Sequence, residues 1–367
     1  MKKLKILISG GGTGGHIFPA ISIANALKTK WEDTEILFIG AEGKMEMEKI
    51  PAAGYEIKGL PVIGLKRKIS FSIFTFIFKT IKSLRLAKKI IKEFKPDVAV
   101  GVGGYASGPA LKAAARLKIP YLLQEQNSYP GITNKLLAKK ADKICVAYDN
   151  MDKFFPADKI IKTGNPIRAD IKNIENKSSK AFKFFNLNPN TPTVLIIGGS
   201  LGAKTINDSI ANTLEEYVNA NIQVIWQTGK TYFETAKKIV DKINSDLIFV
   251  SDFIFKMEYA FAVADIIISR AGASSISELC VVGKPTILVP SPNVSEDHQT
   301  KNALALSTIN AAILIKDSEA REKLTKQCLE LLKDEEYRKV LAKNIKKLEL
   351  VNSAEIIAEE IKKMANV

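Results

Sequence analysis

The feature that most constrains the fold is a pattern that occurs twice: a short apolar run, then glycines, then a helical pattern. The first copy occupies residues 3–9 and the glycines at 10–15, and the second occupies residues 193–197 and the loop at 198–203. Continuous apolar runs of this length are typical of parallel strands that are buried on both faces. Such strands alternating with helices indicate a doubly wound α/β sheet, so two copies predict two Rossmann-like domains.

Further strand and helix patterns alternate behind each copy, and a chain of 367 residues is long enough for two cores. A helix is predicted from about Pro19, which suits a first turn, to Lys28. The turn at Gly164 interrupts the alternation, so we predict one domain over residues 1–164 and another over 165–344, with a helix at about 345–367 returning to the first. Other strands are predicted at residues 35–39, 98–102, 121–123, 144–147, 222–226, 247–250, 265–268 and 286–289.

The composition is that of a folded protein, with 46% hydrophobic and 25% charged residues. The three cysteines are far apart and form no metal or redox motif, which suits a reducing cytosol. The apolar run at residues 6–8 is too short for a signal peptide, and no run is long enough to span a bilayer.

The turn at residues 272–278 indicates a nucleotide site. It follows an apolar run at residues 264–269 and precedes a helical pattern that ends near Gly283. Ligands bind at the carboxyl ends of strands in such sheets, and the first N–H groups of a helix are suited to anions. Glu278 lies one turn into the helix, where its carboxylate can accept two hydrogen bonds from a ribose diol.

The two glycine loops leave alternatives open. Gly10-x-Gly12-x-x-Gly15 matches the dinucleotide fingerprint, but no acid ends the second strand, and Glu42 lies just past it. A glycine turn that serves only close helix packing is the other alternative. The second loop resembles a P-loop, but Ala203 stands where glycine is needed before Lys204. We expect a diphosphate loop that uses Ser200, with the next helix starting at Gly202.

His16 is the leading candidate for acid–base chemistry, although most isolated histidines have no catalytic role. It and His298 are the only histidines, and it follows the first glycine loop. A helix N-terminus lowers a histidine pKa, which would keep His16 neutral and able to accept a proton. The chain has no Asp-x-Asp pair, so we expect no metal ion, and N–H groups would hold a diphosphate instead.

A basic segment accounts for most of the net charge of +15: residues 66–95 hold ten Lys or Arg and one Glu, a net +9. It also contains four Phe and three Ile within residues 69–78. A core helix with a solvated basic end is one interpretation, and an interfacial helix on an anionic membrane is the other. Nucleic acid is disfavoured because the basic residues flank the Phe cluster instead of interleaving with it. The predicted membrane contacts are Phe71, Phe74, Phe78, Lys66, Arg67, Lys68, Lys79 and Lys82.

Taken together, the motifs resemble the lipid II-forming members of glycosyltransferase family 28, over nearly the whole chain. The residues that carry the resemblance are Gly11-Gly12-Thr13-Gly14-Gly15-His16, Gly103-Gly104-Tyr105 with Ser107-Gly108-Pro109, Glu125-Gln126-Asn127, Gly164-Asn165-Pro166-x-Arg168, Gly198-Gly199-Ser200-x-Gly202-Ala203, Arg270-x-Gly272-Ala273 with Ser277-Glu278, and Gln299 with Asn302-Ala303.

The resemblance implies a GT-B fold, in which two Rossmann-like domains flank an interdomain cleft. It implies a hexosyltransferase that moves GlcNAc from UDP-GlcNAc to the C4 hydroxyl of MurNAc in lipid I (undecaprenyl-diphospho-MurNAc-peptide), with inversion. The product, lipid II, would serve peptidoglycan synthesis and thus cell-wall biogenesis, cell shape and cell division. The implied location is peripheral, on the cytoplasmic face of the bacterial inner membrane, with other cell-wall enzymes as further partners and no cofactor.

The resemblance also assigns roles to residues. Glu278 would bind the ribose, Ser200 the diphosphate, and Ile254 the uracil through its backbone. Gly11, Gly12, Gly103, Gly104 and Tyr105 would face the diphosphate of the acceptor, and His16 would be the base. The remaining implied donor contacts are Thr13, Gly14, Gly15, Asn127, Arg168, Ala273, Ser274, Ser275, Ile276, Ser277, Gln299 and Asn302.

The sequence departs from the family pattern at four positions, which hold Gln124, Leu201, Ala271 and His298. Two other classes of function stay open at this point. One is a nicotinamide-dependent oxidoreductase that uses the first glycine loop. The other is a non-catalytic membrane protein that binds a nucleotide sugar.

Overall fold

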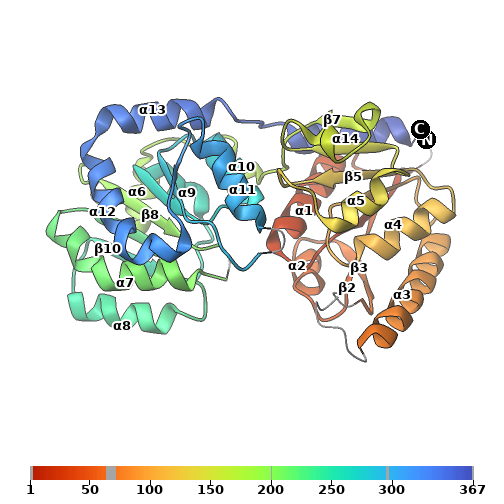
Figure 1. The fold of residues 1–367 in the computed structure, drawn as a ribbon, viewed down its shortest axis with the longest axis horizontal. Coiled ribbons are helices and arrows are strands. Elements are labelled where there is room, and N and C mark those ends of the chain that lie inside the picture. The colour runs from red at the N-terminus through yellow and green to blue at the C-terminus, as the bar shows by residue number, and fades with distance from the viewer. Residues whose placement is uncertain (1–2, 63–71, 200, 295–296, 366–367) are drawn as a thin grey trace. The chain divides into compact units, whose positions relative to one another are not determined.

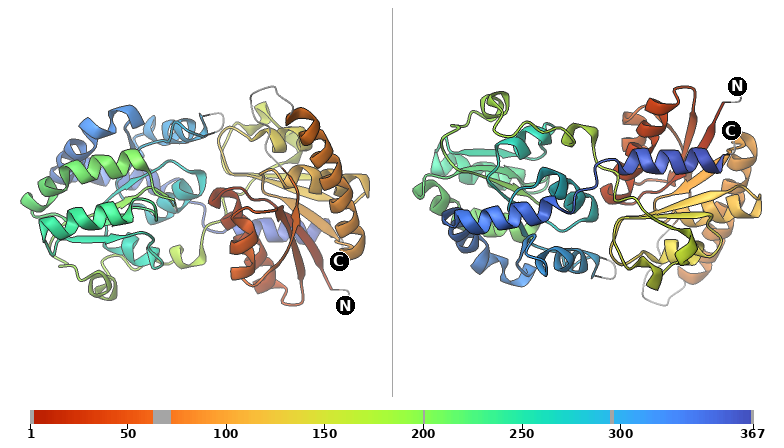
Figure 2. Two further views of the ribbon diagram at one scale, coloured as in Figure 1. Left: turned by 90° about the horizontal axis from the view of Figure 1, so that it is seen from below. Right: turned by 90° about the horizontal axis from the view of Figure 1, so that it is seen from above.

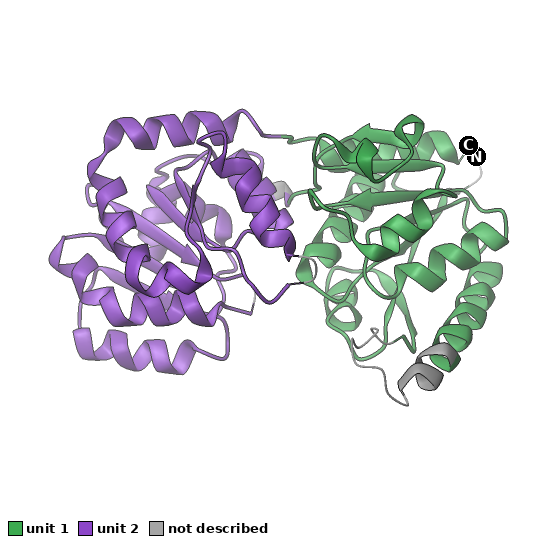
Figure 3. Ribbon diagram, viewed as in Figure 1, with its two compact units in different colours: residues 1–167, 350–367 green, residues 168–349 purple. Residues whose placement is uncertain are grey.

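The chain divides into two compact units in the computed structural model, which describes residues 3–62, 72–199, 201–294 and 297–365. The first unit comprises Met1–Ile167 together with Leu350–Val367, and the second comprises Arg168–Glu349 (Figure 3). The chain thus leaves the first unit three residues after Gly164 and returns to it near its end. Among the described residues, no helix combines the length and the apolar character needed to cross a membrane.

The first unit is built on a parallel sheet, described with seven strands in the order β3-β2-β1-β4-β5-β6-β7. Helices lie on both of its faces (Figure 1). The strands are β1 (Lys5–Ser9), β2 (Glu35–Ala41), β3 (Glu56–Leu60), β4 (Val98–Gly101), β5 (Tyr121–Glu125), β6 (Lys143–Val146) and β7 (Ile160–Lys162). The helices are α1 (Gly14–Lys30), α2 (Glu46–Ala52), α3 (Ser72–Phe94), α4 (Ser107–Arg116), α5 (Ile132–Ala138) and α14 (Ser353–Met364).

The two faces of this sheet explain why its central strands are largely apolar. Ile6 and Ile8 belong to a buried cluster that α1 and α14 cover. Leu7, between them, points to the opposite face and packs in a second cluster with α3, α4 and α5. Successive side chains of a strand point to opposite faces, so a sheet covered on both sides requires apolar residues throughout.

The second unit repeats this plan with a sheet described as six parallel strands in the order β10-β9-β8-β11-β12-β13. Its α7, α8 and α12 pack against one face, where Trp226 and Tyr217 are fully buried. The strands are β8 (Thr193–Ile197), β9 (Gln223–Gln227), β10 (Ile248–Ser251), β11 (Ile266–Ser269), β12 (Thr286–Leu288) and β13 (Ile313–Leu314). The helices are α6 (Ser179–Phe185), α7 (Lys204–Asn219), α8 (Phe233–Ile243), α9 (Met257–Val263), α10 (Ala273–Val282), α11 (His298–Ser307), α12 (Ala320–Lys333) and α13 (Glu335–Lys346).

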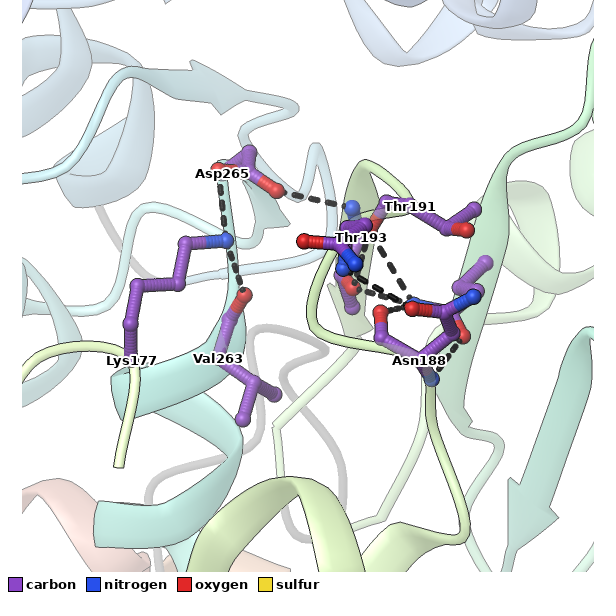
Figure 4. Close-up of polar contacts among 8 residues, drawn as sticks. Lys177, Asn188, Thr191, Thr193, Val263 and Asp265 are labelled. Atoms are coloured by element: carbon purple, nitrogen blue, oxygen red, sulfur yellow. Dashed lines mark hydrogen bonds and ion pairs between the residues drawn. The ribbon is translucent and has the colours of Figure 1, made fainter. Parts of the chain in front are cut away.

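Aspartates brace the amino ends of the central strands in both units. Asp97, which precedes β4, accepts the backbone N–H of Lys5 in β1 at 2.9 Å. Asp265 precedes β11 and accepts the N–H of Thr193 in β8 at 2.8 Å, while Lys177 pairs with its other oxygen at 2.7 Å (Figure 4). These bonds satisfy N–H groups at the starts of the strands, which have no partner in the neighbouring strand. They fix the amino ends of the central strands, at the end of each sheet opposite the glycine loops.

The C-terminal helix is part of the first unit, where α14 packs directly on α1 (Figure 2). Ala354, Ile357 and Ile361 of α14 are buried in the same cluster as the inner face of α1. An ion pair joins Lys30 to Glu359 at the rim of this contact. The last helix therefore stabilises the helix that carries His16.

Several predicted boundaries are wrong in detail. Helix α1 begins at Gly14, five residues before Pro19, because the Thr13 carbonyl accepts the N–H groups of His16 and Ile17 at 3.1 Å. Helix α7 begins at Lys204, not at Gly202, whose φ of 78° is incompatible with a right-handed helix. The predicted tail helix is interrupted between α13 and α14, at residues 347–352.

Candidate functional site

Four of the predicted ligand loops follow strands at the centre of a sheet. In the first sheet the winding reverses between β1 and β4, and in the second between β8 and β11. Ligands of doubly wound sheets bind at this switch point, outside the carboxyl ends of the strands. The loops at residues 10–13, 102–106, 198–203 and 270–272 follow these four strands, so each unit brings its two predicted loops together.

Helix α10 presents its N-terminus at the switch point of the second unit. Gly272 is its N-cap, no side chain of the described residues caps the helix, and its first turn contains no acid. Ala273 and Ile276 are buried, and the Ser277 hydroxyl donates to the Ala273 carbonyl at 3.1 Å. The first-turn N–H groups, including those of Ser274 and Ser275, are suited to bind an anion.

Glu278 forms a bidentate ion pair with Arg168. The Nε of Arg168 donates to Oε1 at 3.0 Å and Nη2 donates to Oε2 at 3.3 Å. The Glu278 side chain is 17% exposed, and burial raises its pKa against the opposing effect of Arg168. Burial alone would lower the pKa of Arg168, but the Glu278 carboxylate raises it. Two residues predicted to bind the same nucleotide thus lie in direct contact.

A second ion pair, which sequence reasoning missed, ties the loops of the second unit together. Arg270, directly after β11, donates through Nη1 to Asp317 at 2.5 Å and to the carbonyl of Val289 at 2.9 Å. The other oxygen of Asp317 accepts the Thr205 hydroxyl in the first turn of α7 at 2.9 Å. Arg270 belongs to the motifs that resemble the family, but no role was assigned to it from the sequence. A cation directly after a central strand was the feature that could have indicated one.

The remaining predicted donor residues of this unit are held by backbone contacts. Asn302 is buried and donates to the Ala271 carbonyl at 3.4 Å, and Gln299 accepts the N–H of Ser291 at 2.8 Å. The N–H of Ile254 donates to the Gln227 side chain at 2.9 Å, so we expect a uracil base to meet its carbonyl. Ser200 lies outside the described residues.

In the first unit, His16 lies against the second glycine loop. Its Nδ1 is 3.2 Å from the Thr13 hydroxyl, and a Cβ at Gly103 would lie 2.9 Å from its Nε2. A Cβ at Gly104 would lie 2.3 Å from the Gly11 carbonyl oxygen. Side chains at positions 103 and 104 would therefore separate the two loops that the structure brings together. Tyr105, which follows them, is exposed.

Glu125 orients Asn127, a role that sequence reasoning did not find. The fully buried carboxyl group accepts the backbone N–H and the side-chain Nδ2 of Asn127 at 3.0 and 3.2 Å. Its other oxygen accepts Gly131 N–H at 3.1 Å and Asn134 Nδ2 at 2.9 Å. Burial raises the pKa of Glu125, and these four donors oppose the rise. The strand β5 extends to Glu125, two residues beyond its predicted end.

Helix α3 is buried along one side and is basic and exposed along the other. Ala87, Ile90 and Ile91 are buried against the sheet. Phe78 is 68% exposed, and the cations that follow it are exposed. These exposed residues are Lys79, Lys82, Arg85, Lys88, Lys89 and Lys92. Lys66, Arg67, Lys68 and Phe71 lie outside the described residues, as does the side chain of Phe74.

The chain is similar to known proteins over nearly its whole length. The profile of the glycosyltransferase family 28 N-terminal domain matches residues 6–146, and that of the C-terminal domain matches residues 193–360. A relative from Parabacteroides distasonis is 56% identical over 99% of both chains, and one from Cytophaga hutchinsonii is 54% identical over 100% of this chain and 98% of its own. Both are named UDP-N-acetylglucosamine–N-acetylmuramyl-(pentapeptide) pyrophosphoryl-undecaprenol N-acetylglucosamine transferase.

Solved structures agree with these matches. The crystal structure of MurG from Acinetobacter baumannii has a TM-score of 0.79 and 27% identity, and the match covers 99% of this chain and 100% of that one. A UDP-GlcNAc 2-epimerase from Neisseria meningitidis has a TM-score of 0.66 at 15% identity, over 99% and 100% of the two chains, and is similar in fold alone. The predicted GT-B architecture of two Rossmann-like domains is confirmed. The chain belongs to glycosyltransferase family 28.

Proposed function

We propose that this protein transfers GlcNAc from UDP-GlcNAc to the C4 hydroxyl of MurNAc in lipid I and so forms lipid II. The observation that carries the proposal is the 56% identity, over 99% of both chains, to a relative named for this transfer. In the reaction the bond from the anomeric carbon to the UDP oxygen breaks as the C4 oxygen attacks from the opposite face. UDP leaves, the acceptor proton passes to a base, and the anomeric configuration inverts.

The second unit supplies the donor contacts in this proposal. The N-terminus of α10 and the Ser200 loop before α7 would face the diphosphate, where negative charge grows as UDP departs. Fixed helix dipoles and N–H groups stabilise such charge without reorganisation. Glu278 would accept the ribose hydroxyls, and Arg168 would hold its carboxylate in place.

The first unit supplies His16 as the base. We assign the imidazole proton to Nδ1, where it donates to the Thr13 hydroxyl at 3.2 Å, so that Nε2 is the nitrogen that accepts the acceptor proton. The contact with Gly103 limits the positions open to this ring. Asn127, oriented by Glu125, would contact the donor, and Tyr105 and the neighbouring glycines would contact the acceptor diphosphate.

The lipid-borne acceptor of this proposal would bring the reaction to a membrane surface. We propose peripheral binding at the cytoplasmic face of the plasma membrane through α3, where exposed Phe78 would enter the acyl boundary and Lys79 and Lys82 would meet anionic headgroups. Other cell-wall enzymes are proposed partners at that surface. The reaction needs no metal in this proposal, so turnover should be unchanged by a chelator such as EDTA.

A UDP-release assay tests the proposed function. UDP should be released from UDP-GlcNAc rapidly with a lipid I analogue and only slowly without it. Binding of UDP-GlcNAc with no release in either case would instead support the non-catalytic alternative. Binding of NADH with no binding of UDP would support the oxidoreductase. None of the similarities reported above favours that alternative.

A further inference from the structure

The first glycine loop encloses a buried carboxyl group that the proposed chemistry does not use. Glu46, the first residue of α2, has an exposed fraction of 0%. Its Oε2 accepts the backbone N–H of Gly12 at 2.9 Å, and its Oε1 accepts the N–H of Ala41, at the end of β2, at 3.0 Å. The carboxyl group therefore joins the loop after β1 to the end of the neighbouring strand.

Two glycines make the space that this side chain occupies. A Cβ at Gly11 would lie 2.2 Å from Glu46 Oε1, and a Cβ at Gly40 would lie 2.7 Å from its Cγ. Both distances are far below van der Waals contact, so no other residue fits at either position without moving Glu46. Gly11, after β1, and Gly40, near the end of β2, thus leave room for the Glu46 side chain.

The position of Glu46 is transmitted to the predicted base through direct contacts. Glu46 holds Gly12, and the carbonyl of Gly11 lies against Gly104 of the second loop. His16 follows the first loop in α1 and packs on Gly103 of the second. A shift of the first loop would consequently move His16 relative to the loop that confines it.

We propose that Glu46 is a positioning residue for the transfer reaction. It holds the first glycine loop in place, and with it His16. This inference rests on the proposed function for its kinetic consequence, whereas its structural consequence can be tested independently.

The test compares Glu46→Gln with Asp97→Asn. Asp97 is a matched control because its carboxylate also accepts a backbone N–H of the β1 segment, at the opposite end of the sheet. A glutamine has one acceptor oxygen, so Glu46→Gln can satisfy only one of the two N–H groups. By hydrogen exchange with mass spectrometry, we expect residues 10–16 to exchange about tenfold faster in Glu46→Gln and at the wild-type rate in Asp97→Asn.

The kinetic readout separates positioning from general destabilisation. We expect Glu46→Gln to lower kcat by about tenfold to a hundredfold while the KM for UDP-GlcNAc changes less than about twofold. Asp97→Asn should retain wild-type kcat, even if both variants lose similar thermal stability. A Cβ at position 40 would lie 2.7 Å from Glu46 Cγ and 2.8 Å from Ile57 Cδ1, so Gly40→Ala would press on both side chains without removing the charge of Glu46. It should reproduce the Glu46→Gln pattern.

Unchanged exchange at residues 10–16 in both Glu46→Gln and Gly40→Ala would overturn the inference, as would equal losses of kcat in Glu46→Gln and Asp97→Asn. Should Glu46→Gln not fold, Gly40→Ala carries both measurements. A wild-type protein that releases no UDP with the lipid I analogue would refute the proposed function instead, and the exchange experiment would still decide the role of Glu46.

Discussion

Replacing Glu278 by glutamine tests whether this carboxylate binds the donor ribose. The carboxylate has two acceptor oxygens with about four lone-pair sites, so it can receive both Arg168 and a ribose diol. Glutamine keeps one acceptor oxygen, and one hydrogen bond to the diol is lost. A hydrogen bond to a charged group is worth about 1.5–3 kcal/mol. We therefore expect UDP to bind roughly 10- to 150-fold more weakly to Glu278→Gln.

Titration calorimetry with UDP and 2′-deoxy-UDP distinguishes this role from a purely structural one. Wild-type protein should bind UDP more tightly than 2′-deoxy-UDP, and Glu278→Gln should lose most of that preference. Asp208→Asn is the control, because Asp208 has the same 17% side-chain exposure and pairs with Arg321 at 2.8 Å in the same unit. If Glu278→Gln weakened UDP and 2′-deoxy-UDP equally, Glu278 would serve only to hold Arg168, and the ribose assignment would be refuted.

Three further predictions concern the first unit. His16→Ala should lower kcat by about a hundredfold with little change in the KM for UDP-GlcNAc, and unchanged turnover would place the base elsewhere. Phe78→Ser should weaken binding to anionic vesicles but spare activity on a soluble acceptor analogue. Phe184→Ser, a control at a phenylalanine of the second unit that is 52% exposed against 68% for Phe78, should leave both vesicle binding and activity unchanged. Burial raises the pKa of Glu125 in the folded protein above its ordinary value of 4.5. The contribution of Glu125 to the free energy of unfolding is therefore complete below pH 4.5, and it is lost as the pH rises through the raised pKa of the folded protein. Urea unfolding of Glu125→Gln should lack this decline, and parallel pH profiles for the two proteins would contradict the account.

The central strands were predictable because burial on both faces forces apolar residues at every position. Residues 193–197 were predicted with the bounds that β8 has. Strand β3 was missed because Glu56, Ile57 and Lys58 alternate in polarity at the edge of the sheet. The start of α1 was misplaced because Pro19 favours a first turn, whereas the Thr13 carbonyl begins the helix five residues earlier.

The loops of the site were predictable as glycine patterns, but the groups that hold them were not. Glu46 lies 34 residues from Gly12 and Asp317 lies 112 residues from Thr205, and local sequence does not specify such pairings. A buried carboxylate that accepts backbone N–H groups has no spacing rule, because tertiary contacts alone bring its partners together. Sequence therefore identified the residues proposed to touch the ligands, and the structure added those that position them.

The most direct measurement of the central claim is the anomeric configuration of the product. Wild-type protein, UDP-GlcNAc and a lipid I analogue should give one UDP for each disaccharide formed, and NMR should show a β-linkage from GlcNAc to the C4 oxygen of MurNAc. An α-linked product, or UDP released with free GlcNAc and no disaccharide, would contradict inverting transfer.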